Sequence, residues 1–126
     1  MKILIVEDEE IMRKALAEAL GGAGFEAVQA GDGEEGLQKA LAEHPDMMLV
    51  DIMMPKMDGI TMLKEIRKDD WGAHAKVMLL TNVSDVTKIA EAMESGMGES
   101  YDYMVKTDWK LQDVIARVKE RLGMAS

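Results

Sequence analysis

The sequence predicts an α/β fold, in which a single domain forms a doubly wound parallel sheet from five strand and helix pairs, a (βα)5 arrangement. Short apolar runs alternate about five times with longer segments that have the period of a helix. Three of the short runs are almost entirely apolar, as in strands buried on both faces of a parallel sheet. The length of 126 residues fits one domain.

The expected strands are residues 2–6, 25–30, 47–50, 77–80 and 101–105, of which the first, third and fourth are the nearly apolar runs. Because the crossovers between parallel strands are right-handed, few topologies remain. Ligands of such sheets bind outside the carboxyl ends of the strands, near a switch in strand order. The residues that end each strand are therefore the first candidates for a functional site.

Each of the five expected helices has apolar residues at helical spacing. These are Ile11, Met12, Ala15, Leu16, Ala19 and Leu20 in the first, Leu37, Ala40 and Leu41 in the second, Leu63 and Ile66 in the third, Ile89, Ala90 and Met93 in the fourth, and Leu111, Val114, Ile115, Val118 and Leu122 in the fifth. Asp32, Ser84 or Asp85, and Asp108 are expected N-caps, because their side chains accept bonds from backbone N–H groups.

Composition and charge exclude several classes of protein. The formal net charge is −9, from 24 acidic and 15 basic residues, which disfavours direct contact with nucleic acid. No cysteine is present, so no disulfide framework is expected. No apolar stretch approaches the ~20 residues of a membrane helix. We therefore expect a soluble, cytoplasmic protein that does not enter a membrane, and we expect its 13 methionines to fill the core.

Charged and polar side chains follow four of the expected strands. Glu7 and Asp8 follow the first, Asp51 the third, Thr81 the fourth and Lys106 the fifth. Each has an ordinary structural explanation, such as a helix cap, a turn cap, strand propensity or a solvated charge. Since a parallel sheet brings these strand ends side by side, the ordinary explanation is weaker for the whole set.

Three carboxylates held close together repel one another, and a divalent cation removes that conflict. Oxygen ligands favour a hard ion, so Mg²⁺ is the expected cofactor, for which Mn²⁺ can substitute. Zinc is disfavoured, because His44 and His74 are expected at helix-end or loop positions away from the acids. With the cation in place, Asp51 can attack phosphorus, while Lys106 neutralises phosphoryl oxygens and Thr81 donates a hydrogen bond.

This combination resembles the receiver domains of bacterial response regulators, the CheY-like family of two-component signal transduction. The resemblance rests on Glu7-Asp8, on the run from Asp51 to Gly59 (DIMMPKMDG), on Thr81 and on residues 103–106 (YMVK). It covers nearly the whole chain, in order and at the family's usual spacing. It implies a receiver domain over residues 1–126 with the flavodoxin-like strand order 2-1-3-4-5.

The resemblance also implies a role for each residue of the set. These roles are phosphorylation for Asp51, direct Mg²⁺ coordination for Asp8 and Asp51, coordination through water for Glu7 and through the backbone carbonyl for Met53, phosphate binding for Lys106, and switching for Thr81 and Tyr103. Pro55 and Gly59 are expected to be structural parts of the loop after the third strand. The expected activity is self-catalysed phosphorylation and dephosphorylation, without turnover of an external substrate.

The resemblance implies two kinds of partner. A sensor histidine kinase or phosphotransfer protein would supply the phosphoryl group. A downstream effector would bind the face made by the fourth helix, the fifth strand and the fifth helix, because Tyr103 lies on that strand.

Three positions depart from the family's pattern. Thr107 replaces the usual proline after Lys106, so we expect a trans peptide between these two residues, since a cis bond without proline costs ~2.5–4 kcal/mol. Asn82 replaces the usual small residue after Thr81, and residues 96–102 form a longer stretch than usual. With Met53 and Val83, Asn82 predicts slow self-dephosphorylation, because the approach of a water is crowded or poorly oriented.

Three other functions compete with a phosphoacceptor receiver. An aspartate phosphatase of the haloacid dehalogenase type carries an acid two residues after its nucleophile, where this chain has Met53. A flavin-binding protein of the same fold needs a hydroxyl- and glycine-rich phosphate loop, and the acids at positions 7–10 would repel the phosphate. A pseudo-receiver that only binds partners would not need the complete acidic set.

Overall fold

The computed structural model describes residues 1–82, 87, 101–106 and 110–124, and these residues form a five-stranded parallel sheet. The strands are β1 (Lys2–Val6), β2 (Glu26–Ala30), β3 (Met47–Asp51), β4 (Val77–Thr81) and β5 (Tyr101–Val105). Their order is β2-β1-β3-β4-β5, with every neighbouring pair parallel. The predicted fold class and strand order are therefore confirmed, and the strands differ from prediction by at most one residue at an end.

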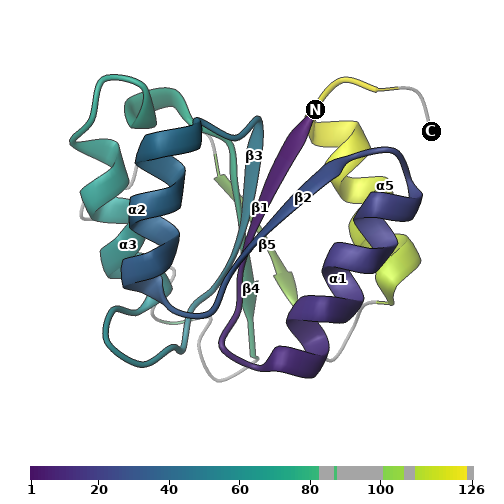
Figure 1. Ribbon diagram of the computed structural model, residues 1–126, viewed down its shortest axis with the longest axis horizontal. Coiled ribbons are helices and arrows are strands. Elements are labelled where there is room, and N and C mark those ends of the chain that lie inside the picture. Colours follow the sequence, from purple (N-terminus) through teal and green to yellow (C-terminus); the bar gives the residue numbers. More distant parts are fainter. Residues whose placement is uncertain (83–86, 88–100, 107–109, 125–126) are drawn as a thin grey trace.

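Helices cover both faces of the sheet. Those in the described part of the chain are α1 (Glu10–Gly22), α2 (Gly33–Glu43), α3 (Gly59–Arg67), the short 3₁₀ helix η1 (Gly72–His74) and α5 (Leu111–Arg121). In Figure 1, α1 and α5 lie on one side of the sheet, and α2 and α3 lie on the other. The predicted fourth helix, with its N-cap at Ser84 or Asp85, falls outside the described residues, as does the Lys106–Thr107 peptide.

The strands β1, β3 and β4 place alternate side chains in two separate cores, because successive side chains point to opposite faces. The core beneath α2 and α3 contains Leu4, Val6, Met48, Val50, Met62, Leu63, Ile66, Val77 and Leu79. The core beneath α1 and α5 contains Ile3, Ile5, Leu16, Leu20, Met47, Leu49, Met78, Leu80, Val114 and Val118. The four methionines in these two sets are at most 1% exposed, so the expectation that methionine fills the core is confirmed for them.

Aspartate side chains begin two of the helices. The carboxylate of Asp32 accepts a bond from the Glu35 N–H at 2.9 Å, as predicted. The carboxylate of Asp58 accepts a bond from the Thr61 N–H at 2.7 Å, and this cap was not predicted. The predicted N-cap Asp108 lies outside the described residues, and the N-cap of α5, which begins at Leu111, is Lys110.

No helix within the described part of the chain is both long enough and apolar enough to cross a membrane.

Candidate phosphoryl-acceptor and cation site

The carboxyl edge of the sheet gathers the side chains that the sequence singled out. Asp51 and Thr81 are the last residues of β3 and β4, while Glu7 and Lys106 follow β1 and β5 directly. The strand register aligns these ends, since Asp51 lies opposite Leu80 and Thr81 lies opposite the last residue of β5. In the sheet, β2 lies on one side of β1 and β3 lies on the other, so the direction of strand order switches at β1. Ligands of such sheets bind at the carboxyl edge beside this switch.

Three carboxylates form the centre of this edge. Glu7, Asp8 and Asp51 each offer one oxygen, and these atoms all lie within 4.8 Å of one another. Glu7 is 1% exposed and Asp51 is 4% exposed, whereas Asp8 is exposed at the rim. An all-oxygen set with two buried acids and one open side suits a hard divalent cation that keeps some of its waters. The residues present therefore fit Mg²⁺.

The ammonium of Lys106 joins the two buried acids. Its Nζ lies 3.0 Å from Asp51 Oδ1 and 3.1 Å from Glu7 Oε2, and the side chain is largely buried. The second oxygen of Glu7 accepts a bond from the Glu9 N–H at 3.3 Å. Removing one partner of a buried ion pair leaves an uncompensated charge, so each of these three side chains depends on the others.

Burial and charge raise the pKa of Asp51. Removal from water is the largest cause and the negative charge of Glu7 adds to it, while the ammonium of Lys106 acts in the opposite direction; the pKa rises from 3.8 to about 7. For Lys106, burial lowers the pKa, but the attraction of Asp51 and Glu7 outweighs it, so the pKa is raised above 10.5. In the metal-free protein, Lys106 therefore stays protonated, and ionisation of Asp51 is disfavoured.

The loop after β3 folds back tightly on the strand that carries Asp51. The Gly59 N–H donates to the Ile52 carbonyl at 2.8 Å, and a Cβ at position 59 would lie 2.3 Å from the Asp51 carbonyl oxygen. The Met57 N–H donates to the Pro55 carbonyl at 2.8 Å across Lys56, whose φ is +68°. This is a γ-turn with its central residue at positive φ, a rare and strained form. The close approach at Gly59 explains why only glycine fits there.

The remaining predicted residues lie around this centre. Met53 follows Asp51 in the loop, and its side chain is 49% exposed. Thr81 is fully buried, and its hydroxyl donates to the Asn82 carbonyl at 2.9 Å. Tyr103 is exposed on β5, where it pairs in register with Leu79. Thr81 and Tyr103 therefore lie on the adjacent strands β4 and β5.

One basic side chain beside this site was not predicted. Arg13, on α1, donates from Nη1 to the carbonyl of Glu7 at 3.0 Å. No sequence pattern indicated this contact, because its acceptor is a backbone atom and any residue at position 7 supplies one.

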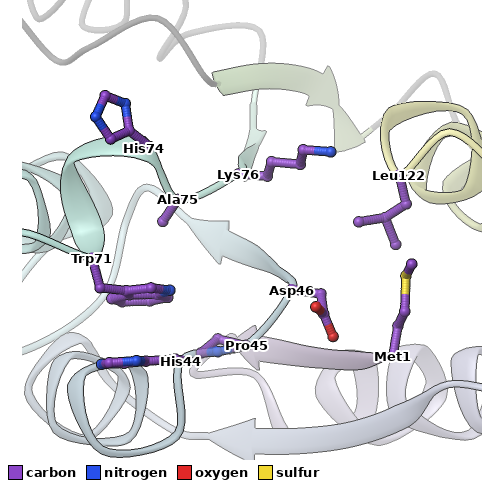
Figure 2. A pocket seen from close by; sticks show the side chains of 9 residues that line it. All are labelled: Met1, His44, Pro45, Asp46, Trp71, His74, Ala75, Lys76 and Leu122. Carbon is purple, nitrogen blue, oxygen red and sulfur yellow. The ribbon is translucent and has the colours of Figure 1, made fainter.

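A separate cavity of about 370 Å³ lies at the opposite, amino end of the strands (Figure 2). His44, at the end of α2, stacks on Trp71 with ring centroids 4.5 Å apart, and His74 lies in η1. Lys76 in its wall donates to the Arg121 carbonyl at 3.0 Å. The two histidines thus lie away from the acidic edge, as expected, and among the described residues the cavity shares none with the acid cluster.

Comparison with known proteins identifies the class. The family model for the response regulator receiver domain matches residues 3–119. The chain therefore belongs to the response regulator receiver domain family and is a receiver domain of two-component signalling. Receiver domains bind Mg²⁺ at an acidic pocket, and response regulators interact with histidine kinases and effectors. They are signalling proteins rather than turnover enzymes.

Particular relatives are similar along most of the chain. The regulator ycf27 of Porphyridium aerugineum is 35% identical over 99% of this chain and 50% of its own length. The alkaline phosphatase synthesis transcriptional regulatory protein PhoP of Bacillus subtilis is 36% identical over 94% of this chain and 47% of its own. The chain spans about half the length of these curated relatives. Among solved structures, the chemotaxis protein CheY4 of Vibrio cholerae is 26% identical, with a TM-score of 0.83 and coverage of 94% and 96%.

Proposed function

We propose that residues 1–126 form a phosphoacceptor domain, in which Asp51 receives a phosphoryl group in a Mg²⁺-dependent reaction. The single observation that carries the proposal is the Lys106 ammonium, held 3.0 Å from Asp51 beside two further acids at the carboxyl edge of the sheet. A structural ion pair alone would need one acid. A buried acid with a raised pKa at such an edge is a functional-site candidate.

The cation site is assigned to four residues. Asp8 and Asp51 would hold Mg²⁺ directly with the backbone carbonyl of Met53, and Glu7 would act through a water. When bound, Mg²⁺ supplies the positive charge that neutralises the acids and the phosphoryl oxygens. Mn²⁺ has the same preference for oxygen ligands and would substitute. The exposed position of Asp8 leaves the site open to the cation and to the donor.

The reaction forms one bond and breaks one. A carboxylate oxygen of Asp51 attacks phosphorus, and the bond from phosphorus to the donor's histidine nitrogen, or to the oxygen of a small donor, breaks with its electron pair staying on the donor. Lys106, already beside Asp51, is positioned to neutralise the transferred group. The hydroxyl of Thr81 would leave the Asn82 carbonyl and donate to the phosphoryl group, which adds charge at the site.

Phosphorylation would shift an existing equilibrium rather than build a new fold. Movement of Thr81 on β4 would be passed to Tyr103 on the adjacent β5, and an effector would bind the face beside it. Changes in amide chemical shift should therefore concentrate between residues 81 and 109. A concentration on α2, around residues 37–41, would contradict this part of the proposal.

The proposal is tested by intact mass after incubation with acetyl phosphate. The expected result is the addition of one phosphoryl group with Mg²⁺, no addition with a chelator, and no addition to Asp51→Ala. An unchanged mass in a folded sample with Mg²⁺ would favour the alternative, a pseudo-receiver that binds partners without phosphorylation.

A further inference from the structure

The loop that carries Glu7 and Asp8 is anchored by a side chain from the helix that follows it. The guanidinium of Arg13 donates from Nη1 to the Glu7 carbonyl at 3.0 Å and from Nε to the Gln29 side-chain oxygen at 3.4 Å. It therefore links α1, the end of β1 and the neighbouring strand β2. Both bonds use fixed donors of a planar group, which restrains direction as well as distance.

The backbone bonds explain why this anchor matters for the acids. The Glu7 N–H donates to the Ala30 carbonyl at 3.1 Å, just beyond the last paired residues of β1 and β2. The Glu7 carbonyl belongs to the next peptide plane, which also contains the N–H of Asp8. Since Arg13 holds that carbonyl, it fixes the plane from which Asp8 departs. Asp8 is exposed, so packing around its side chain restrains it much less than it restrains Glu7.

Charge alone would give Arg13 the opposite effect. A guanidinium near a divalent cation repels it, so removal of the positive charge should strengthen cation binding if position did not matter. Groups that orient metal ligands without touching the metal typically contribute about 10–100-fold in affinity. The two effects therefore differ in sign, and a single measurement separates them.

We propose that Arg13 is a positioning residue for the cation site, and that it raises Mg²⁺ affinity by orienting the peptide between Glu7 and Asp8. This inference rests on the proposed function, because it requires that the acid cluster binds Mg²⁺. Arg13 would act through the Glu7 carbonyl, without being a ligand of the cation itself.

The test is a calorimetric titration of the full chain with Mg²⁺ alone. Arg13→Gln removes the charge and the two-point contact, and we expect it to weaken binding about 10-fold or more. Arg13→Lys keeps the charge but loses the planar group, and we expect an intermediate loss. Lys14→Gln is the matched control, because it removes the same charge from the next residue, whose ammonium pairs with Glu10 on the surface. We expect Lys14→Gln to bind Mg²⁺ as tightly as the unchanged chain, or slightly more tightly.

Equal or tighter Mg²⁺ binding by folded Arg13→Gln would overturn the inference. A second measurement is the chemical shift of the Asp8 backbone amide in the metal-free protein. This shift should change in Arg13→Gln and stay unchanged in Lys14→Gln. If Arg13→Gln does not fold, Gln29→Ala replaces it, and unchanged Mg²⁺ affinity in that variant counts against the inference. Absence of Mg²⁺ binding by the unchanged chain would instead refute the proposed function, so the two failures are distinguishable.

Discussion

The raised pKa of Asp51 predicts that this side chain destabilises the metal-free protein as the pH rises. The folded-state pKa, about 7, lies above the ordinary value of 3.8. A group of this kind contributes stability that is fully present below 3.8 and is lost as the pH rises through about 7. Asp51→Asn keeps the shape of the side chain but cannot ionise. The variant should therefore gain stability relative to the unchanged chain between these two pH values.

The magnitude follows from the size of the shift. The rise from 3.8 to about 7 corresponds to an upper limit of ~4 kcal/mol, at ~1.36 kcal/mol for each pK unit. The interval from pH 5 to the folded-state pKa is about two pK units, so the loss of unfolding free energy between roughly pH 5 and pH 8.5 is at most ~3 kcal/mol. Solvent screening and relaxation around Lys106 reduce the expected difference to about 1–2 kcal/mol.

The assay is urea unfolding followed by circular dichroism, at about pH 5 and about pH 8.5, with a chelator present. The free energy of unfolding of Asp51→Asn minus that of the unchanged chain should be larger at the higher pH. Asp70→Asn is the control, because it removes the same charge from an exposed position. Mg²⁺ at the higher pH should stabilise the unchanged chain and have much less effect on Asp51→Asn. A difference between Asp51→Asn and the unchanged chain that does not vary with pH would refute the reasoning.

Three further predictions concern packing, charge and lifetime. A Cβ at Gly72 would lie 1.9 Å from the Ile66 carbonyl oxygen, so Gly72→Ala should lower the free energy of unfolding by about 2 kcal/mol or more. The matched control is Gly22→Ala, which has open space around the new methyl group and should be neutral or stabilising by up to about 1 kcal/mol. Lys106→Met leaves two buried acids without their cation and should cost about 3 kcal/mol in metal-free urea unfolding, partly recovered by Mg²⁺. Asn82→Ala should speed decay of the phosphorylated state, by up to ~100-fold, in a mass-spectrometric time course; an unchanged rate would exclude water access at this side chain as the control.

The sheet was predictable because three of its strands, β1, β3 and β4, are nearly apolar on both faces. Apolar runs such as residues 77–80 leave little choice but a buried parallel strand, and Asp51 and Lys106 meet because parallel strands end together. The sequence could not show which acid Lys106 would pair with, since that depends on side-chain directions at the edge. In the structure, Lys106 contacts both Asp51 and Glu7.

The elements that sequence reasoning missed depend on single local contacts. Asp58 precedes a glycine, a pattern typical of a turn, and only the bond to the Thr61 N–H reveals it as a helix cap. The N-cap of α5 is Lys110, and since lysine is not a preferred capping residue, nothing in the sequence indicated that the helix begins after it. Arg13 was missed because its acceptor is a backbone carbonyl.

The most direct test of the central claim is to locate the phosphoryl group on the chain. The phosphorylated protein is treated with borohydride, which reduces an acyl phosphate to an alcohol, and is then digested and sequenced by tandem mass spectrometry. We predict a single reduced residue, at position 51, which appears with Mg²⁺ and is absent when Mg²⁺ is removed by a chelator or when Asp8 is changed to Asn. Reduction at Asp8 or Asp58 in place of position 51, or equal reduction without Mg²⁺, would contradict the assignment of Asp51 as the acceptor in a cation-dependent site.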